Sequence, residues 1–148
     1  MKYLLGIEVL DIDNGVCLSQ RKYCMELLHD FGMLGCKPIN TPLEGNFVPK
    51  RDTDLLGEEL VENVTEFQKL IGKLIYLTVT RPDIAYAIQV LSQFMHKPYK
   101  YHFNIAFRVL RYLKNSPGKG INIQKGDVFD LKAYVDGDWA NACLLESL

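Results

Sequence analysis

The sequence predicts an α+β fold with an N-terminal β-hairpin, a mainly helical middle and a C-terminal pair of β-strands. Three observations lead to this fold class. Two short β-prone segments flank a turn signal within the first 20 residues, and residues 67–114 repeat their apolar side chains at helical spacing. A Pro-Gly turn at 117–118 then precedes two further β-prone segments. Such changes of hydrophobic period are the main secondary-structure signal in a single sequence.

The composition is that of a globular protein with one core. Of its 148 residues, 48% are hydrophobic and 24% are charged. No apolar run approaches the ~20 residues of a membrane span, so we expect no membrane contact. The opening stretch MKYLLGIEVLDID has one Lys and places Glu8 inside a short apolar run, which is unlike a signal peptide. We therefore expect an intracellular protein, cytoplasmic or nuclear, without a targeting signal.

The hairpin is predicted from residues 3–9 and 16–20, which flank the segment DIDNG. We place its turn at Asn14 and Gly15, because both residue types tolerate positive φ. The same segment has two aspartates at the spacing of a calcium loop. Gly15 stands where a third ligand belongs, however, and Lys22 where that loop needs a Glu. The segment therefore indicates a turn and not a calcium site.

Four helices are predicted between the hairpin and the C-terminal strands. Apolar spacing places them at about 21–31, 67–77, 84–95 and 99–114. Residues 36–62 contain three prolines and no sustained period, so we expect a surface connection there. The helices should share one apolar core that includes Phe67, Leu70, Leu74, Ile88, Leu91, Val109 and Leu113.

Charge is distributed unevenly along the chain. Residues 44–66 carry seven acids, whereas residues 84–126 carry none. In the last helix Lys100, Arg108 and Arg111 fall opposite the apolar positions, and we call these three residues the basic stripe. Such a stripe can follow a phosphate backbone, or it can be an ordinary solvated face. We expect the acidic segment to lie away from it.

Residues that commonly bind metals are sparse and scattered. The four cysteines form no close pair, which favours free thiols in a reducing compartment. His96 and His102 have no Cys or Glu at ligand spacing, so we predict that both are surface residues.

Two strands are predicted after the turn, at about 121–125 and 131–139. The second contains the stretch AYVDGDWA, in which Asp136 and Asp138 project to the same face because side chains alternate along a strand. One strand with two carboxylates is too little to hold a pair of metal ions. An exposed acidic strand without function is the alternative.

Four stretches together resemble the Pol polyprotein of copia-type retrotransposons. They are LLGIEV with GVCLSQRKYCMELLHDFGMLGCKPINTPLE, then FQKLIGKLIYLTVTRPDIAYAIQVLSQFMHKP, RVLRYLKNSPGKGI and AYVDGDWA. The resemblance implies that residues 1–115 are the C-terminal part of a reverse transcriptase domain, with thumb- and connection-like helices. It implies that residues 116–148 are the truncated start of a ribonuclease H-like domain.

The resemblance also implies a role for particular residues. The hairpin is similar to the primer grip of reverse transcriptases, so Gly6 and Glu8 would approach the primer backbone. The helices would hold an RNA/DNA hybrid or duplex through its phosphates, with Lys100, Arg108 and Arg111 as contacts. Such contacts position a duplex without reading its sequence.

Asp136 aligns with the first ribonuclease H carboxylate and would be a metal ligand in an incomplete site. The complete family enzyme is an RNA-directed DNA polymerase with ribonuclease H, for which Mg²⁺ is implied. Its Tyr-x-Asp-Asp box would precede residue 1, and its other carboxylates would follow the first ribonuclease H strand. We therefore expect this chain to hold no cofactor and to be inactive on its own.

The resulting prediction is a Pol polyprotein fragment that keeps nucleic-acid-handling elements but lacks both complete active sites. The rest of the polyprotein would be its partner if the two are expressed together. A non-enzymatic nucleic-acid-binding module and a non-functional translated transposon remnant are the alternatives.

Overall fold

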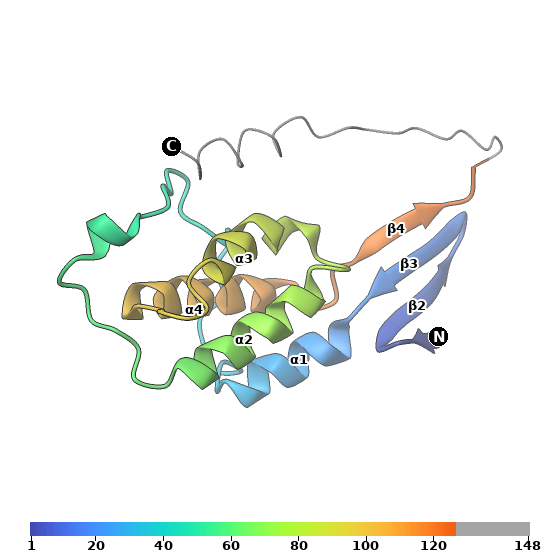
Figure 1. The fold of residues 1–148 in the computed structure, drawn as a ribbon. Coiled ribbons are helices and arrows are strands. Elements are labelled where there is room, and N and C mark those ends of the chain that lie inside the picture. The colour runs from blue at the N-terminus through green and yellow to red at the C-terminus, as the bar shows by residue number, and fades with distance from the viewer. Residues whose placement is uncertain (127–148) are drawn as a thin grey trace.

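The structure, a computed structural model, describes residues 1–126, in which four helices gather beside an antiparallel sheet (Figure 1). The helices are α1 (Arg21–Asp30), α2 (Val64–Leu77), α3 (Ala85–Ser92) and α4 (Lys100–Asn115). The strands are β1 (Lys2–Leu4), β2 (Ile7–Ile12), β3 (Gly15–Ser19) and β4 (Ile121–Gln124). Short 3₁₀ turns occur at η1 (Asp52–Leu55) and η2 (Pro82–Ile84). The α+β class, the N-terminal hairpin and the four helices are therefore confirmed.

The sheet has the order β1-β2-β3-β4, and every neighbouring pair is antiparallel. Ile12 is opposite Gly15, so the β2–β3 turn is centred on residues 13–14, one residue earlier than predicted. Gly15 has another role. A Cβ there would lie 2.0 Å from the carbonyl oxygen of Ile123 in β4, so only glycine lets the two strands approach. Residues 13–14 thus form the turn, and Gly15 allows the close contact between β3 and β4.

The first predicted strand is interrupted by a tight turn that the sequence analysis missed. Leu5 and Gly6 have φ values of 51° and 80°, and Leu4 pairs with Ile7 across them. Two consecutive positive φ values are typical of the two-residue turns that join antiparallel strands. Leu5 is 86% exposed at this turn.

β4 pairs with β3, although β4 follows the predicted domain boundary at 115/116. The strand at about 121–125 is confirmed, and its pairing with the N-terminal hairpin is new. The second predicted strand, at about 131–139, lies outside the described residues. The boundary itself stays a prediction.

The core lies among the four helices, as predicted. The seven named core residues are all at most 2% exposed. At 25 cal/mol per Å² of apolar surface, fully burying one such side chain contributes on the order of 2 kcal/mol. Helical periodicity alone therefore located the main source of stability.

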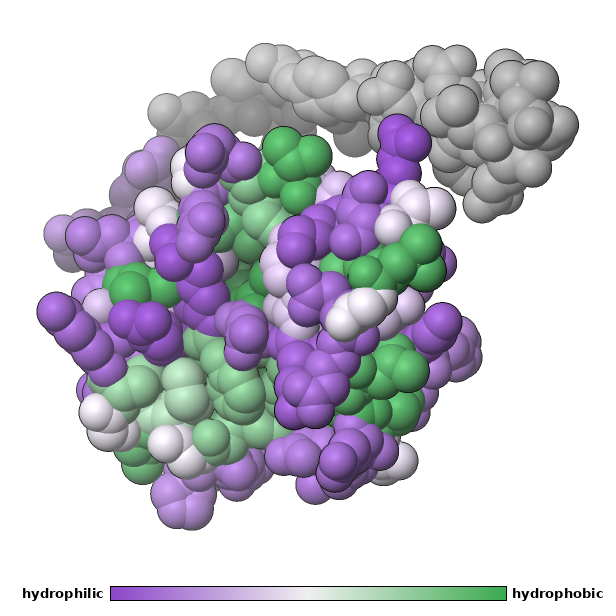
Figure 2. All heavy atoms as spheres, turned by 90° about the vertical axis from the view of Figure 1, so that its left-hand side faces the viewer, coloured by the Kyte–Doolittle hydropathy of each residue, from purple (hydrophilic) through white to green (hydrophobic). Residues whose placement is uncertain are grey.

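The connection between α1 and α2 is more structured than predicted. Leu55 in η1 is fully buried, and Leu60 forms an isolated β-bridge with Tyr99. Other apolar residues of the connection stay outside, such as Leu56 at 81% exposure. Figure 2 shows the face of the molecule on the left-hand side of Figure 1, where polar side chains surround separate hydrophobic patches. None of the helices within residues 1–126 is long and apolar enough to cross a membrane.

Candidate nucleic-acid interface

Helix α4 carries the basic stripe on a strongly two-sided surface. Its inner side buries Ile105, Ala106, Val109, Leu110 and Leu113 in the core. Lys100, Arg108 and Arg111 are on the other side, as the spacing predicted. Because residues three and four apart share a helix face, folding places the three cations in one row.

The stripe is not a free solvated face, because residues 36–44 run along it. The Arg111 Nε donates to the Lys37 carbonyl at 2.8 Å, and the Ile39 amide donates to the Arg111 carbonyl at 3.3 Å. The Arg108 guanidinium donates to Thr41 Oγ1 at 3.0 Å. We call residues 36–44 the covering segment. Sequence periodicity could not reveal it, since the segment has no regular secondary structure.

The expectation that the acidic segment lies away from the stripe is wrong. Glu44 lies 3.9 Å from Arg108, and Glu59 lies 2.6 Å from Lys100. In the absence of nucleic acid, these nearby carboxylates lower the electrostatic energy of the closely spaced cations. Both carboxylates are largely exposed, at 72% and 69% of their side-chain surface, so each pair is weak.

Two cations of α4 are held by backbone oxygens instead of carboxylates. Arg111 bonds to the Lys37 carbonyl, and Lys114 Nζ bonds to the Cys36 carbonyl. A carbonyl is a dipole without net charge, so these contacts orient the cations without neutralising them. The C-terminal half of α4 thus presents two positive charges in fixed positions.

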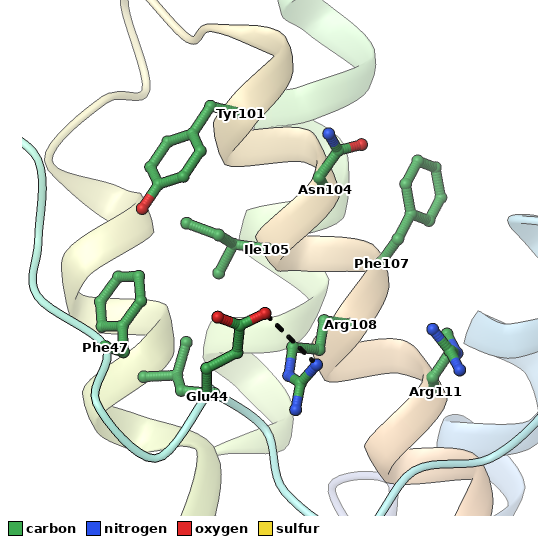
Figure 3. A pocket seen from close by; sticks show the side chains of 9 residues that line it. Glu44, Phe47, Tyr101, Asn104, Ile105, Phe107, Arg108 and Arg111 are labelled. Atoms are coloured by element: carbon green, nitrogen blue, oxygen red, sulfur yellow. Dashed lines mark ion pairs between the residues drawn. The ribbon is translucent and has the colours of Figure 1, made fainter. Parts of the chain in front are cut away.

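A cleft of about 420 Å³ opens between the N-terminal half of α4 and residues 43–47 (Figure 3). Aromatic and apolar side chains line it together with the two arginines of the stripe. The lining residues are Leu43, Glu44, Phe47, Tyr101, Asn104, Ile105, Phe107, Arg108 and Arg111. The Nε of Arg108 is buried and has no hydrogen-bond partner among the described residues.

The N-terminal hairpin places its two candidate residues differently. Glu8 is 7% exposed, and its carboxylate accepts a hydrogen bond of 2.9 Å from the Lys22 amide in the first turn of α1. A carboxylate there satisfies a free amide and interacts favourably with the helix dipole. Gly6 lies at the exposed turn, where the Tyr76 hydroxyl donates to the Leu5 carbonyl. Their contact with a primer stays a prediction.

A buried ionic cluster links η2 to the C-terminal end of α4, and the sequence analysis missed it. The Arg81 side chain is 2% exposed and donates two hydrogen bonds, of 3.0 and 2.9 Å, to the Asp83 carboxylate. A third bond of 2.8 Å joins Arg81 to the Ser116 carbonyl. Tyr112 donates to Asp83 at 2.6 Å. The sequence pattern predicts only that a helix begins near residue 84.

The electrostatics of the cluster favour the charged form of Asp83. Burial opposes ionisation of this carboxyl, but hydrogen bonds from Arg81 and Tyr112 outweigh it and hold the pKa below its usual range. The cluster is satisfied internally, which indicates a structural role.

The candidate metal ligand Asp136 lies outside the described residues. Within residues 1–126, no three His, Cys, Asp or Glu side chains are grouped so that they could hold a metal ion.

Comparison with known proteins shows clear relatives. The chain is 41% identical over 140 residues to the retrovirus-related Pol polyprotein from transposon RE1 of Arabidopsis thaliana, and 43% identical over 140 residues to that from transposon RE2. Each match covers 95% of this chain but 9% of the relative. An uncharacterised mitochondrial protein of Arabidopsis thaliana is 38% identical over 138 residues, which are 93% of this chain and 55% of that protein. No family model and no solved structure matches.

Proposed function

The chain corresponds to a segment of the Pol polyprotein of copia-type retrotransposons, and we propose that its described part binds nucleic acid. The proposed ligand is the phosphate backbone of an RNA/DNA hybrid or duplex. The contact surface is the outer face of α4 together with the covering segment. The activity of the complete polyprotein is a further proposal, since the chain spans about a tenth of these two relatives' length.

The observation that supports this proposal is the way Arg111 and Lys114 are held. Both lie on one helix, and both are oriented by backbone carbonyls that leave their charge intact. A row of fixed cations can neutralise several phosphates and release the counterions bound to them.

The paired cations of the stripe join this surface on binding. The carboxylates of Glu44 and Glu59 are largely exposed, so a phosphate can replace each of them at small cost. Lys100 and Arg108 then add to the contacts of Arg111. On this proposal the acids keep the surface compact when it is empty and withdraw when it is occupied.

The hairpin turn contributes a second contact in the proposal. The turn projects Leu5 into solvent, where a nucleic-acid backbone can reach it. Position 6 needs glycine because a Cβ there would lie 2.9 Å from the Tyr76 hydroxyl, so Gly6 keeps the turn against α2. Glu8 acts indirectly here, because its carboxylate holds the hairpin to α1.

Salt-dependent binding tests the proposal. For duplex DNA, the logarithm of the affinity falls with the logarithm of salt concentration by roughly 0.9 per neutralised phosphate. Replacing Arg111 and Lys114 with Gln should therefore lower the slope by about two units, equally for unrelated sequences. The measurement is the affinity for an RNA/DNA hybrid at several salt concentrations.

A matched control removes the same charge elsewhere. Lys22→Gln with Lys69→Gln alters one residue each on the outer surfaces of α1 and α2 and should leave the slope unchanged. The triple variant Lys100→Ala, Arg108→Ala and Arg111→Ala should lose two to three units. Equal slopes for all four proteins would show that α4 does not face the phosphates.

A further inference from the structure

The cleft beside α4 contains binding groups that folding leaves unused. Among residues 1–126, the buried Nε of Arg108 has no hydrogen-bond partner, although an unpaired buried donor is costly. The acid nearest to Arg108 is Glu44, at 3.9 Å, which is beyond ordinary hydrogen-bond length. One guanidinium nitrogen of Arg108 donates to Thr41 Oγ1 at 3.0 Å, and its other donors are available to an anion with better geometry than Glu44.

The other walls of the cleft are aromatic. Figure 3 shows Tyr101 and Phe47 on one side of Ile105, with Arg108 and Arg111 further along α4. The Lys50 ammonium covers the Tyr101 ring at 4.4 Å, which helps to fix that ring in place. The amide of Asn104, an exposed residue on the same helix, can both donate and accept hydrogen bonds. The site thus combines aromatic rings, an amide and two guanidinium groups.

We infer that this cleft binds one unpaired nucleotide, with its base against Tyr101 and Phe47 and its phosphate at Arg108 and Arg111. A planar base stacks on aromatic rings whatever its sequence, and a guanidinium binds a phosphate through two parallel hydrogen bonds. The volume of about 420 Å³ lies within the range of small-ligand sites. In this arrangement the Glu44 carboxylate occupies the phosphate position in the empty protein.

The inference rests on the proposed function, because a hybrid bound at α4 would bring an unpaired nucleotide close to the cleft. A hybrid lying on the outer face of α4 keeps its bases stacked and paired, so none of them can enter the cleft. A single-stranded extension of the same hybrid has free bases, and the cleft lies on the same helix as Arg111. The described surface would therefore hold a junction between paired and unpaired nucleotides.

Three nucleic acids distinguish duplex binding at α4 from nucleotide binding in the cleft. They are a blunt RNA/DNA hybrid, the same hybrid with a four-nucleotide single-stranded extension, and a free eight-nucleotide DNA strand. Stacking of one base on an aromatic side chain should make the extended hybrid bind roughly 5- to 10-fold more tightly than the blunt one. The full chain is used throughout, and affinity is measured at one fixed salt concentration.

Variants at two lining residues identify the cleft as the source of that difference. Tyr101→Phe keeps the ring and should keep the preference for the extended hybrid. Tyr101→Leu keeps apolar bulk without the ring and should abolish the preference, while leaving affinity for the blunt hybrid unchanged. Glu44→Gln removes the competing carboxylate, so the blunt hybrid should also gain affinity through Arg108. The extended hybrid should gain about threefold more than the blunt one, because its phosphate is held beside the stacked base. Glu44 is exposed, so the difference between these two gains tests the cleft even if Tyr101→Leu does not fold.

The outcomes are distinguishable. If the blunt and extended hybrids bind equally and Glu44→Gln changes both affinities by the same factor, the inference is overturned while the proposed function stands. If only the free strand binds, and Tyr101→Leu weakens it, the cleft is supported and duplex binding is overturned. If none of the three binds, both ideas fail. Tight binding of an acidic peptide in place of the strand would also overturn the nucleotide assignment.

Discussion

His102 shows how far the environment of a single residue can depart from its sequence context. Predicted as a surface residue, it is 1% exposed, and its ring stacks on Phe94 with centroids 3.9 Å apart. Its Nδ1 accepts a hydrogen bond of 3.0 Å from the Tyr99 amide, which satisfies a free donor at the start of α4. Its Nε2 is buried without a partner among the described residues. The prediction of a surface histidine was therefore wrong, because the imidazole serves as both a core residue and a helix cap.

Burial of His102 predicts a pH-dependent stability. Burial lowers its pKa from 6.5 to about 4, against a weaker attraction from Asp52. The unfolded chain then binds this proton more readily than the folded protein, so stability falls as the pH drops below 6.5. From pH 7 to pH 4.5 the loss should be on the order of 2 kcal/mol, measured by urea unfolding at both values.

Two substitutions test whether this pH dependence of stability originates at His102. His102→Asn should lose stability at pH 7 but should not show the His102 contribution to the pH dependence. His96→Asn changes an exposed histidine and should behave as the unaltered chain does. A pH dependence that survives His102→Asn in full would place its origin elsewhere.

At the scale of elements, α2 is stabilised by a side-chain cap at its N-terminus. The Asn63 side chain accepts a hydrogen bond of 3.1 Å from the Glu66 amide, one of the donors that a helix start leaves free. Asn63→Ala should therefore destabilise the protein by about 1 kcal/mol, whereas Asn63→Asp should cost little because a carboxylate caps equally well. Thermal unfolding of both variants checks this. Equal losses would mean that the cap contributes nothing specific.

The covering segment is the element that defines the candidate interface. It has no regular secondary structure, yet it supplies carbonyls to Arg111 and Lys114 and a hydroxyl to Arg108. Its position converts a simple charged helix face into a surface with fixed cations and a lined cleft. The proposed binding at α4 therefore depends on a loop that secondary-structure patterns describe only as a connection.

At the scale of the whole molecule, polar contacts join the sheet to the helices. The Thr80 hydroxyl and the Gln20 amide oxygen lie 2.8 Å apart, and Ser19 donates to the Gly118 carbonyl at 3.1 Å. The Arg81–Asp83 cluster lies between these contacts in the chain and bonds to Ser116 and Lys119. These polar contacts thus help to fix the sheet relative to the helices.

Removing the Arg81–Asp83 ion pair should lower the stability of the folded protein. Asp83→Asn leaves the Arg81 charge buried without a counter-charge, which should destabilise the protein by about 3 kcal/mol. Lys119→Gln removes an exposed contact to the same carboxylate, at 3.3 Å, and should cost less than about 1 kcal/mol. Because the pKa of Asp83 is lowered, its contribution is present above pH 3.8 and is lost as the pH falls below that value. Urea unfolding at pH 7 should separate the two variants, and equal losses would rule out a structural role for the buried charge pair.

The sequence by itself determined the elements, the core and the polyprotein resemblance. Helices, strands and the seven named core residues follow from periodicity, because one face of each element must leave water whatever its neighbours are. The cation row on α4 follows from the same spacing. Matches of 41% and 43% identity to Pol polyproteins then agreed with the resemblance that the four sequence stretches had indicated.

Only the tertiary structure decided which polar groups meet. The partners of Arg108, Arg111 and Lys114 lie more than 60 residues earlier in the chain, and no local pattern encodes such pairings. The same holds for β4 beside β3 and for His102 beside Phe94, since both depend on how the elements pack. Hydrophobic burial acts on every apolar residue alike and is therefore readable from spacing. Hydrogen bonds and ion pairs act at short range between particular atoms, so they are fixed only once the chain is folded.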